Sequence, residues 1–303
     1  MTYSIVARDP NTGELGVGVQ TNRPTVGAIV PWVEPGIGAV ATQSRANVSF
    51  GRQALDLMRT GLAAPAALRA VLAGDDEPEV RQVGVIDAAG NTAAHTGGSC
   101  IPEYGAVQGG NFSTQANMML NPGVPEAMAA AYESSTGALI DRILAALDAA
   151  QATGGDIRGM QSAAIFTSPP PAGPGEPLVG VPPAGRWDLR IDNSEDPLGE
   201  IRRLKDLITA ENSMREPDAN ETLAGAKSAY AAAANLSPSD ELTFWYGVRN
   251  LTLALGEFDQ AAKILEPLFT RAPEWKELLH RLPDLPADSP LLARFPRDAD
   301  QSQ

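Results

Sequence analysis

Residues 1–21, MTYSIVARDPNTGELGVGVQT, are the stretch of sequence on which the fold prediction rests. Residues 2–9 and 15–21 are strand-like, and the first of these segments is amphipathic. The intervening DPNTG supplies proline, asparagine and glycine, which favour turn geometry. The stretch therefore predicts a β-hairpin at the start of the chain.

Thr2 is a candidate catalytic residue in this hairpin. Removal of Met1 would give Thr2 a free α-amine, and methionine aminopeptidases usually act when the second residue is small. A threonine hydroxyl is a poor nucleophile until a base takes its proton, and an α-amine with a pKa of about 7.7–8.0 supplies that base within the same residue. We therefore expect Thr2 to act as a nucleophile. The alternative is an ordinary first strand that begins Met-Thr by chance.

Length, composition and charge limit the classes of protein that fit. A chain of 303 residues with 43% hydrophobic residues can hold one large core with an appendage, or two domains. No apolar run approaches the roughly 20 residues that span a bilayer, and charged residues interrupt the position of a signal peptide. We expect a cytoplasmic protein. The formal charge of −14 argues against binding to nucleic acid or to an anionic membrane.

Several kinds of catalytic site are excluded by residue usage. All four lysines follow residue 200, so the first 200 residues contain neither a Schiff-base lysine nor a Walker-type phosphate loop. Cys100 is the single cysteine, and His95 and His280 are the two histidines. This excludes an intrachain disulfide and a zinc site rich in cysteine and histidine. We expect no cofactor and no metal.

The order of the remaining elements predicts the fold class. Strands are expected at 26–33, 38–43, 82–87, 91–95, 162–167 and 186–191, and helices at 49–59, 64–73, 124–134, 137–152 and 197–210. Groups of strands alternate with groups of helices, which favours an α+β fold with two packed sheets and helices outside them, a four-layer αββα sandwich. A doubly wound fold has one supporting signal, Gly36-x-Gly38-x-x-Ala41, but no helix follows it directly.

Composition changes near residue 217, where the chain becomes an alanine-rich helical sequence. We divide the chain into a domain of residues 1–214 and an all-α tail of residues 215–303. The spacing in the tail resembles tetratricopeptide-type helical hairpins, with about one and a half repeats. The aromatic residues Phe244, Trp245 and Tyr246 are expected in the core of these hairpins. Ahead of the tail, the proline-rich TSPPPAGPGEP is expected to be an exposed loop.

Several blocks in the first domain occur together in a known order: TYSIVARDPNTGELGVGVQT, VGAIVPWVEPGIGAVATQ, RQVGVIDAAGNTAAHTG and GGDIRGMQSAA. Over residues 2–208 they resemble a bacterial family of unknown function whose fold is similar to that of the N-terminal-nucleophile (Ntn) hydrolases. The resemblance implies an αββα fold with Thr2 at the mouth between the two sheets, and it implies no established substrate. Members also carry a helical tail that is sometimes labelled a peptidoglycan-binding module. Ala116 stands where the family usually has glycine.

Asn117 and Asp156 complete the candidate catalytic group, and Arg158 is a candidate substrate-binding residue beside them. Asn117, beside Gln115, could stabilise the oxyanion that forms when Thr2 attacks an amide; alternatively it caps or turns the chain. Asp156 and Arg158 lie in a glycine-rich loop and could orient the α-amine and hold the substrate. Their alternative role is an ion pair that secures the loop.

Gln43 and Arg45 are candidate substrate-binding residues. They follow the fourth strand, at a position where a strand end could face the cleft, and arginine suits a substrate carboxylate. The alternative is an ordinary solvated loop. His95 with Ser99 is a weaker catalytic candidate because the sequence has no G-x-S-x-G motif. Cys100 could also be a nucleophile, but we expect it to be a buried structural thiol.

The leading hypothesis is an amidohydrolase that acts on a small amide, ureide or acylated amino-acid derivative, with Thr2 as nucleophile. We expect a homo-oligomer, a dimer. A second hypothesis is a catalytically silent binding or scaffold protein whose helical tail contacts a partner. A third is a metal hydrolase in which Asp9, Asp156 and Asp192 converge.

Overall fold

The computed structural model describes residues 2–168, 186–215 and 218–297. The contacts divide the chain into two compact units, Met1–Arg202 and Arg203–Gln303. This division falls within helix α5 (Pro197–Ser213), whereas the sequence predicts a boundary after residue 214. Met1 and most of the proline-rich segment, residues 169–185, lie outside the described residues.

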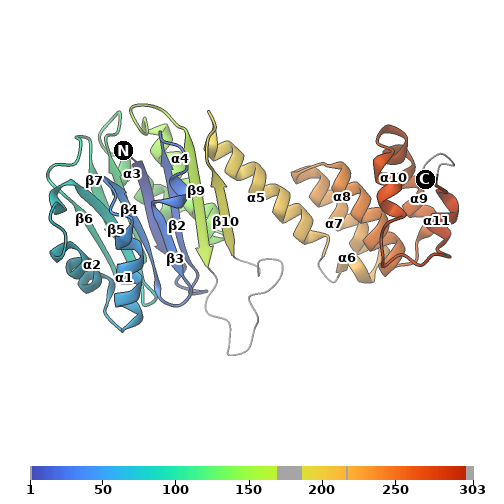
Figure 1. Ribbon diagram of the computed structural model, residues 1–303, viewed down its shortest axis with the longest axis horizontal. Helices are drawn as coiled ribbons and strands as arrows, with labels where there is room; N and C mark the ends of the chain where they lie inside the picture. Colours follow the sequence, from blue (N-terminus) through green and yellow to red (C-terminus); the bar gives the residue numbers. More distant parts are fainter. Residues whose placement is uncertain (1, 169–185, 216–217, 298–303) are drawn as a thin grey trace. The chain divides into compact units, whose positions relative to one another are not determined.

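Two antiparallel sheets form the centre of the N-terminal unit (Figure 1). Six strands are ordered β10-β9-β2-β1-β8-β7, and four are ordered β3-β4-β5-β6. The larger sheet consists of β1 (Thr2–Arg8), β2 (Leu15–Thr21), β7 (Gly105–Gly109), β8 (Phe112–Asn117), β9 (Ser162–Ser168) and β10 (Trp187–Ile191). The smaller sheet consists of β3 (Pro31–Glu34), β4 (Gly38–Ser44), β5 (Arg81–Asp87) and β6 (Thr92–Thr96). The predicted α+β class is confirmed, and so is the hairpin of β1 and β2.

Two pairs of helices cover the two sheets. Helices α3 (Val124–Ser134) and α4 (Leu139–Ala152) pack on the six-stranded sheet, and α1 (Ser49–Arg59) and α2 (Ala64–Ala73) pack on the four-stranded sheet (Figure 1). The opposite faces of the sheets contact each other, since β1 and β2 lie against β4. The glycines of LGVGVQT have a clear packing role, because a Cβ on Gly18 would overlap Ile143 of α4.

The space between the sheets has an apolar part and a polar part. Buried aliphatic side chains form the apolar part: Val6, Leu15, Val17, Val19, Val26, Val30, Ala39, Ala41, Ile86 and Ala164. Toward the start of β1 the inward-facing side chains become polar, beginning with Ser4. The sandwich therefore encloses a hydrophobic core at one end and a hydrogen-bonded network at the other.

The strand predicted at 26–33 is only partly correct. Residues Val26–Ala28 form a 3₁₀ turn, and the strand β3 begins at Pro31. Thr25 has a φ of 59°, and a Cβ on Gly27 would lie 3.1 Å from the Cβ of Ala164 in β9. The chain therefore turns tightly against β9 before it enters the smaller sheet, and a short apolar run does not reveal such a turn.

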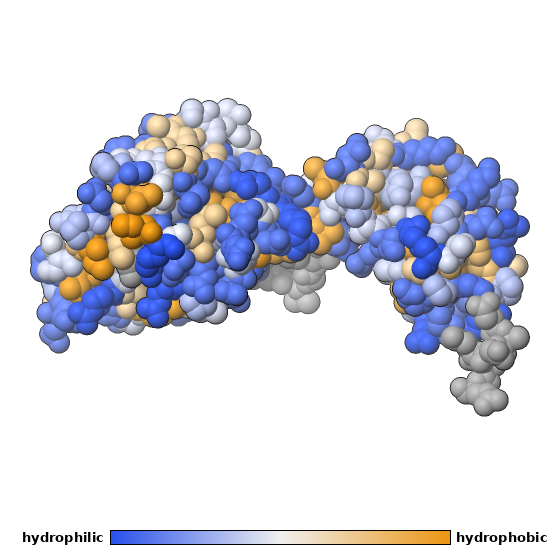
Figure 2. All heavy atoms as spheres, turned by 90° about the horizontal axis from the view of Figure 1, so that it is seen from above, coloured by the Kyte–Doolittle hydropathy of each residue, from blue (hydrophilic) through white to orange (hydrophobic). Residues whose placement is uncertain are grey.

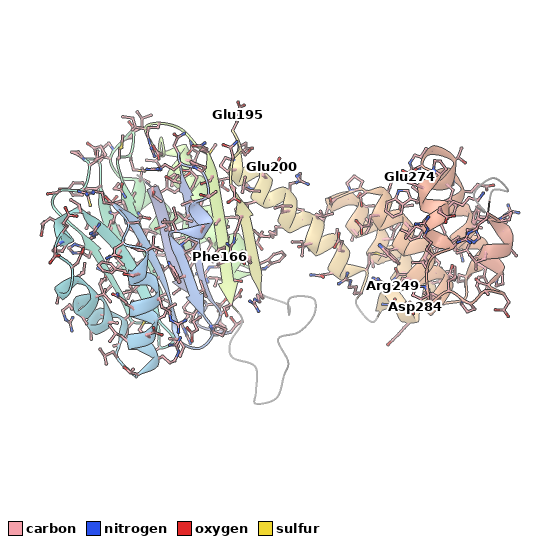
Figure 3. All side chains as sticks on the ribbon, viewed as in Figure 1. Phe166, Glu195, Glu200, Arg249, Glu274 and Asp284 are labelled. Atoms are coloured by element: carbon pink, nitrogen blue, oxygen red, sulfur yellow. The ribbon has the colours of Figure 1, made fainter. Side chains whose placement is uncertain are left out.

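Helices make up the described part of the C-terminal unit. After the second half of α5 they are α6 (Asp218–Glu221), α7 (Leu223–Leu236), α8 (Asp240–Trp245), a π-helical segment (Tyr246–Ala254), α9 (Phe258–Arg271), α10 (Glu274–Leu279) and α11 (Pro290–Arg294). Phe244 and Tyr246 are buried in its core as expected, whereas Trp245 is partly buried and has the guanidinium of Arg249 4.9 Å from its ring centre. Arg249 is labelled in Figure 3. No helix in the described ranges has both the length and the apolar character needed to cross a bilayer.

Candidate functional site

Thr2 begins β1, a central strand of the six-stranded sheet, and polar residues flank it. Asn117 of β8 is its direct antiparallel partner. On the other side, Thr2 Oγ1 donates a hydrogen bond to Oγ1 of Thr21, the last residue of β2, at 3.2 Å. Because Ser4 bonds Gln43 of the facing sheet, alternation along β1 directs the side chain of Thr2 into the space between the sheets as well. Thr2 itself is 5% exposed.

A network of buried amides links the two sheets beside Thr2. Ser4 Oγ donates to Gln43 Oε1 at 2.6 Å, and Gln43 Nε2 donates to Gln82 Oε1 at 2.7 Å and to the carbonyl of Thr2 at 3.2 Å. Gln115 Nε2 donates to Ser4 Oγ at 2.7 Å. These side chains are fully or almost fully buried. The network thus fixes the backbone of Thr2 from the opposite sheet.

Gln82 determines how the amide of Asn117 is oriented. Gln82 Nε2 donates to the carbonyls of Ala116 and Gly105, at 2.8 and 3.2 Å, so its Oε1 must face the other way. Asn117 Nδ2 donates to that Oε1 at 2.8 Å. The other end of the Asn117 amide, Oδ1, is buried and has no hydrogen-bond partner among the described residues. A buried carbonyl oxygen without a donor is rare and calls for an explanation.

Asp156 and Arg158 lie beyond the start of β1, between the segments that follow its two neighbouring strands, β2 and β8. Asp156 forms an isolated β-bridge with Met119, which follows β8, and its Oδ2 accepts from the backbone N–H of Asn22, which follows β2, at 3.1 Å. Its carboxylate is fully buried and pairs with Arg158, whose Nη2 lies 2.7 Å from Oδ2. The Asp156 segment therefore connects the chain that follows β2 with the chain that follows β8, next to Thr2.

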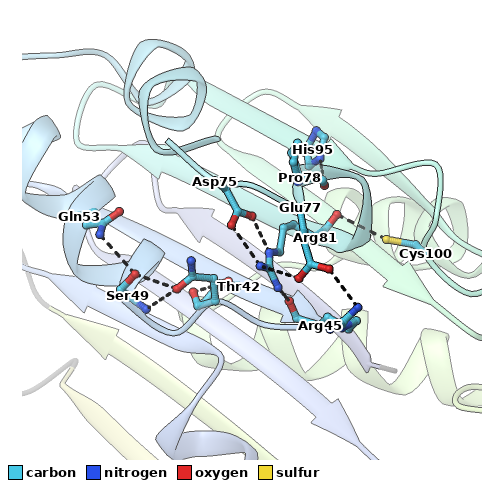
Figure 4. Close-up of polar contacts among 11 residues, drawn as sticks. Thr42, Arg45, Ser49, Gln53, Asp75, Glu77, Pro78, Arg81, His95 and Cys100 are labelled. Atoms are coloured by element: carbon cyan, nitrogen blue, oxygen red, sulfur yellow. Dashed lines mark hydrogen bonds and ion pairs between the residues drawn. The ribbon is translucent and has the colours of Figure 1, made fainter. Parts of the chain in front are cut away.

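Gln43 and Arg45, two of the three predicted substrate-binding residues, lie in different surroundings. Gln43 is 1% exposed, and both ends of its amide are used in the network. Arg45 has an exposed side chain whose Nη1 lies 3.5 Å from Oε1 of Glu77. Arg45 belongs to a polar cluster around Arg81, whose guanidinium pairs with Asp75 at 2.6 Å (Figure 4). Gln43 thus joins the group around Thr2, and Arg45 joins this surface cluster.

His95 and Cys100 both contact backbone carbonyls. His95 Nε2 lies 2.8 Å from the carbonyl oxygen of Pro78, and Cys100 Sγ lies 3.4 Å from that of Arg81 (Figure 4). Cys100 is buried. These contacts give both side chains structural roles, and nothing in them supports a catalytic pair of His95 with Ser99.

The three aspartates of the metal hypothesis do not assemble. Asp9 follows the far end of β1 from Thr2, where it binds the turn that leads to β2. Within the described ranges, no group of three or more histidine, cysteine, aspartate or glutamate side chains could hold a metal ion. The geometry therefore gives no support to convergence of Asp9, Asp156 and Asp192.

Exposed apolar side chains surround this end of the unit. Backbone hydrogen bonds place residues 101–103, 118–120 and 155–157 next to one another, directly after Asn117. Ile101, Leu120 and Ile157 on these segments, and Tyr104 directly after the first of them, are 43–53% exposed. Figure 2 looks onto the end where β1 begins and shows hydrophobic side chains gathered there. We call these four residues the apolar rim.

Ser4, Thr21 and Gln82 belong to the polar side chains around Thr2 and Asn117. They are absent from the candidates predicted from the sequence. Glutamine and serine at inward positions of strands that elsewhere carry valine and alanine are the available signal, because a polar side chain at such a position must find a buried partner. The sequence alone does not say which strands meet, so it could not connect Gln82 with Asn117.

Comparison with known proteins identifies the family. A model described as a family of unknown function, DUF1028, matches residues 2–201. The chain belongs to this family. The crystal structure of protein SPO2555 from Silicibacter pomeroyi, a DUF1028 protein, is 28% identical with a TM-score of 0.60, over 71% of this chain and 90% of that one. Anbu, the ancestral beta-subunit from Yersinia bercovieri, is 12% identical with a TM-score of 0.27, over 55% of this chain and 80% of that one. No curated protein matches.

Proposed function

We propose that this DUF1028 protein is an amidohydrolase of the N-terminal-nucleophile type, with Thr2 as nucleophile once Met1 has been removed. The observation that carries the proposal is the placement of Thr2. It is the first residue of a central strand, its hydroxyl faces the space between two sheets, and Asn117 and Thr21 flank it. A catalytic N-terminal threonine needs this combination of a fixed hydroxyl and polar neighbours.

The proposed reaction uses the Thr2 hydroxyl, the α-amine that forms when Met1 is removed, and the side-chain amide of Asn117. The α-amine takes the Thr2 hydroxyl proton, Oγ1 attacks the amide carbonyl, and the proton passes to the leaving nitrogen. Asn117 Nδ2 carries two N–H groups, one of which bonds Gln82, and the other is the proposed donor to the oxyanion. Water then hydrolyses the acyl-enzyme and regenerates Thr2.

The surrounding residues support the site in different ways. Gln43 positions Thr2 through its carbonyl, and the buried carboxylate of Asp156 holds the segment beside the expected position of the amine. Arg158 keeps 26% of its side chain exposed and could also contact a substrate carboxylate. The apolar rim favours a substrate with an apolar group, such as an acylated amino acid. Arg45, which contacts Glu77 and Arg81, is not part of the proposed active site.

The layering is consistent with the same proposal. Helices α3 and α4 pack on the six-stranded sheet, and α1 and α2 pack on the four-stranded sheet, which supports the αββα order that we propose. Membership of DUF1028 is compatible with it, since that family has no assigned function. Fold alone does not establish chemistry, so the proposal depends on Thr2.

Covalent labelling tests the proposal without a known substrate. The full chain is produced as a fusion whose cleavage leaves Thr2 as the first residue, and it is incubated with a β-lactone, an electrophile that acylates N-terminal nucleophiles. We expect one added mass, mapped to Thr2, in the wild type and in Thr2→Ser, and none in Thr2→Ala. The exposed Thr25 provides a matched control, and Thr25→Ala should be labelled like the wild type.

Two results would contradict the proposal. Equal labelling of the wild type and Thr2→Ala would place the reactive group elsewhere. No labelling of any form would favour the second hypothesis, a silent binding or scaffold protein whose helical tail contacts a partner. Intact mass of the protein made without a fusion shows separately whether cells remove Met1.

A further inference from the structure

We infer that Asn117 also positions the α-amine of Thr2, by accepting a hydrogen bond from it at Oδ1 after Met1 is removed. The inference rests on the proposed function, because it assigns a partner to the base of that reaction. It gives a second role to Asn117: the nitrogen end of its amide bonds Gln82 and serves the oxyanion, while the oxygen end holds the amine. Asn117 is in this respect a positioning residue.

The direction of the β1 backbone supports the inference. The N–H of Arg8 donates to the carbonyl of Asn111 at 2.8 Å, which continues the ladder from β1 to β8. In an antiparallel ladder, every second residue directs its backbone N–H toward the same neighbouring strand. Thr2 is an even number of residues before Arg8, so its nitrogen also points toward β8. The α-amine therefore lies on the Asn117 side of β1.

The unpartnered oxygen of Asn117 supplies the second observation. Asn117 is 1% exposed, and its Oδ1 lacks a donor among the described residues. Rotating the amide by 180° would not help, because it would set Oδ1 against Gln82 Oε1, which two backbone carbonyls hold in place. Cleavage of the bond between Met1 and Thr2 turns an amide N–H into an amine with further hydrogens. Removal of Met1 thus gives the Thr2 amine new N–H donors on the side of β1 where Asn117 Oδ1 lacks a donor.

The expected effect is a change in the pKa of the amine. A hydrogen bond from an ammonium to a neutral amide oxygen favours the protonated form and raises the pKa. The neighbours from β2, β4 and β5, namely Thr21, Gln43 and Gln82, are uncharged. The charged groups on the segments around the start of β1 include the paired Asp156 and Arg158 and the exposed Arg23, Arg45 and Glu103. Arg81 precedes Gln82 on β5 and pairs with Asp75, and Asp148 of α4 acts on Tyr3.

The test measures the amine directly. Full-length protein released from a fusion with Thr2 first is acetylated with trace acetic anhydride at a series of pH values. Peptide mass spectrometry then gives the pKa of the Thr2 amine separately from the lysines. We expect Asn117→Ala to lower this pKa by about one pH unit and Asn117→Asp to raise it. Both variants lose the donor to Gln82, so the opposite signs isolate the acceptor. Thr25→Ala, at an exposed position, should leave the pKa unchanged.

The outcomes separate the inference from the proposed function. An unchanged amine pKa in Asn117→Ala would overturn the inference, even if β-lactone labels Thr2. A lowered pKa in Asn117→Ala, with no labelling of the wild type, would support the contact and refute the hydrolase. If Asn117→Asp fails to fold, Asn117→Ala and Thr25→Ala still decide the question. Far-ultraviolet circular dichroism confirms that the measured variants are folded.

Discussion

Gly84 of β5 faces Gln115 of β8 so closely that a Cβ on Gly84 would overlap the side-chain amide of Gln115. This approach lies at the polar end of the space between the two sheets, where Gln115 bonds Ser4. The absence of a side chain at position 84 therefore makes room for the amide network beside Thr2.

Gly84→Ala is expected to destabilise the N-terminal unit by about 1–3 kcal/mol, because the added methyl group must displace Gln115 or separate the sheets. Gly110→Ala is the matched control, since a Cβ there meets nothing within 4 Å. Urea unfolding of both variants gives the comparison. An equal effect at the two positions would show that Gly84 does not mark a close approach.

Arg158→Leu is expected to cost about 3–5 kcal/mol, because it leaves the fully buried carboxylate of Asp156 without its cation. Arg52→Leu removes a comparable ion pair with Asp56 on an exposed face of α1, and it should change stability by less than about 1 kcal/mol. Urea unfolding at neutral pH measures both. A small effect of Arg158→Leu would mean that Asp156 finds other donors or water.

Local sequence predicts much of this fold. The hairpin of β1 and β2 depends on a short turn, and helix α4 follows from apolar residues at helical spacing, so neither needs information from distant residues. Val26–Ala28 shows the limit, since its tight turn depends on packing against Ala164, far along the chain. Local preference gives way where tertiary contacts decide.

The candidate site was harder to predict for the same reason. Thr2 can be predicted as a nucleophile from its own chemistry, because an N-terminal threonine needs no distant partner. Its pairing with Asn117 joins segments separated by more than a hundred residues. The sequence of neither segment predicts that the two strands are neighbours in one sheet. Gln82 enters the site from a third segment and a different sheet. Its contribution becomes visible only when the sheets are packed together.

The stability of the N-terminal unit is expected to fall above about pH 10. Burial raises the pKa of Tyr132 to about 12, although Arg142 over its ring lowers it, and burial together with Asp148 and Asp156 raises the pKa of Tyr3. The unfolded chain then loses these protons at lower pH than the folded chain. The stabilisation is complete below pH 10 and is lost as the pH rises toward about 12, at up to about 1.4 kcal/mol per pH unit for each tyrosine.

Urea unfolding at pH 8 and pH 11 tests this expectation. Tyr132→Phe should reduce the loss of stability between the two pH values, because phenylalanine has no proton to release. Tyr104→Phe, at an exposed position, should leave the loss unchanged. A loss that is the same in Tyr132→Phe and in the wild type would exclude Tyr132 as a source of the alkaline instability.

Gln43 and Gln82 are expected to be energetically coupled. Gln82→Leu leaves the carbonyls of Ala116 and Gly105 and the amide of Asn117 without their partner, at a cost of about 2–4 kcal/mol. Gln43→Leu leaves Ser4 without an acceptor and should cost a similar amount. Gln43 Nε2 donates a hydrogen bond to Gln82 Oε1 at 2.7 Å. Each single substitution removes this hydrogen bond, so the loss of the same bond is counted in both single costs.

The double variant Gln43→Leu/Gln82→Leu should therefore lose less stability than the sum of the single losses, by about 1 kcal/mol or more. A double-mutant cycle measured by urea unfolding gives this coupling energy. Gln53→Leu, on the exposed face of α1, combined with Gln82→Leu is the control, and these two losses should add. Additive losses for Gln43 and Gln82 would mean that each glutamine acts alone, and the backbone of Thr2 would then owe its fixed position to the strand ladder rather than to the network between the sheets.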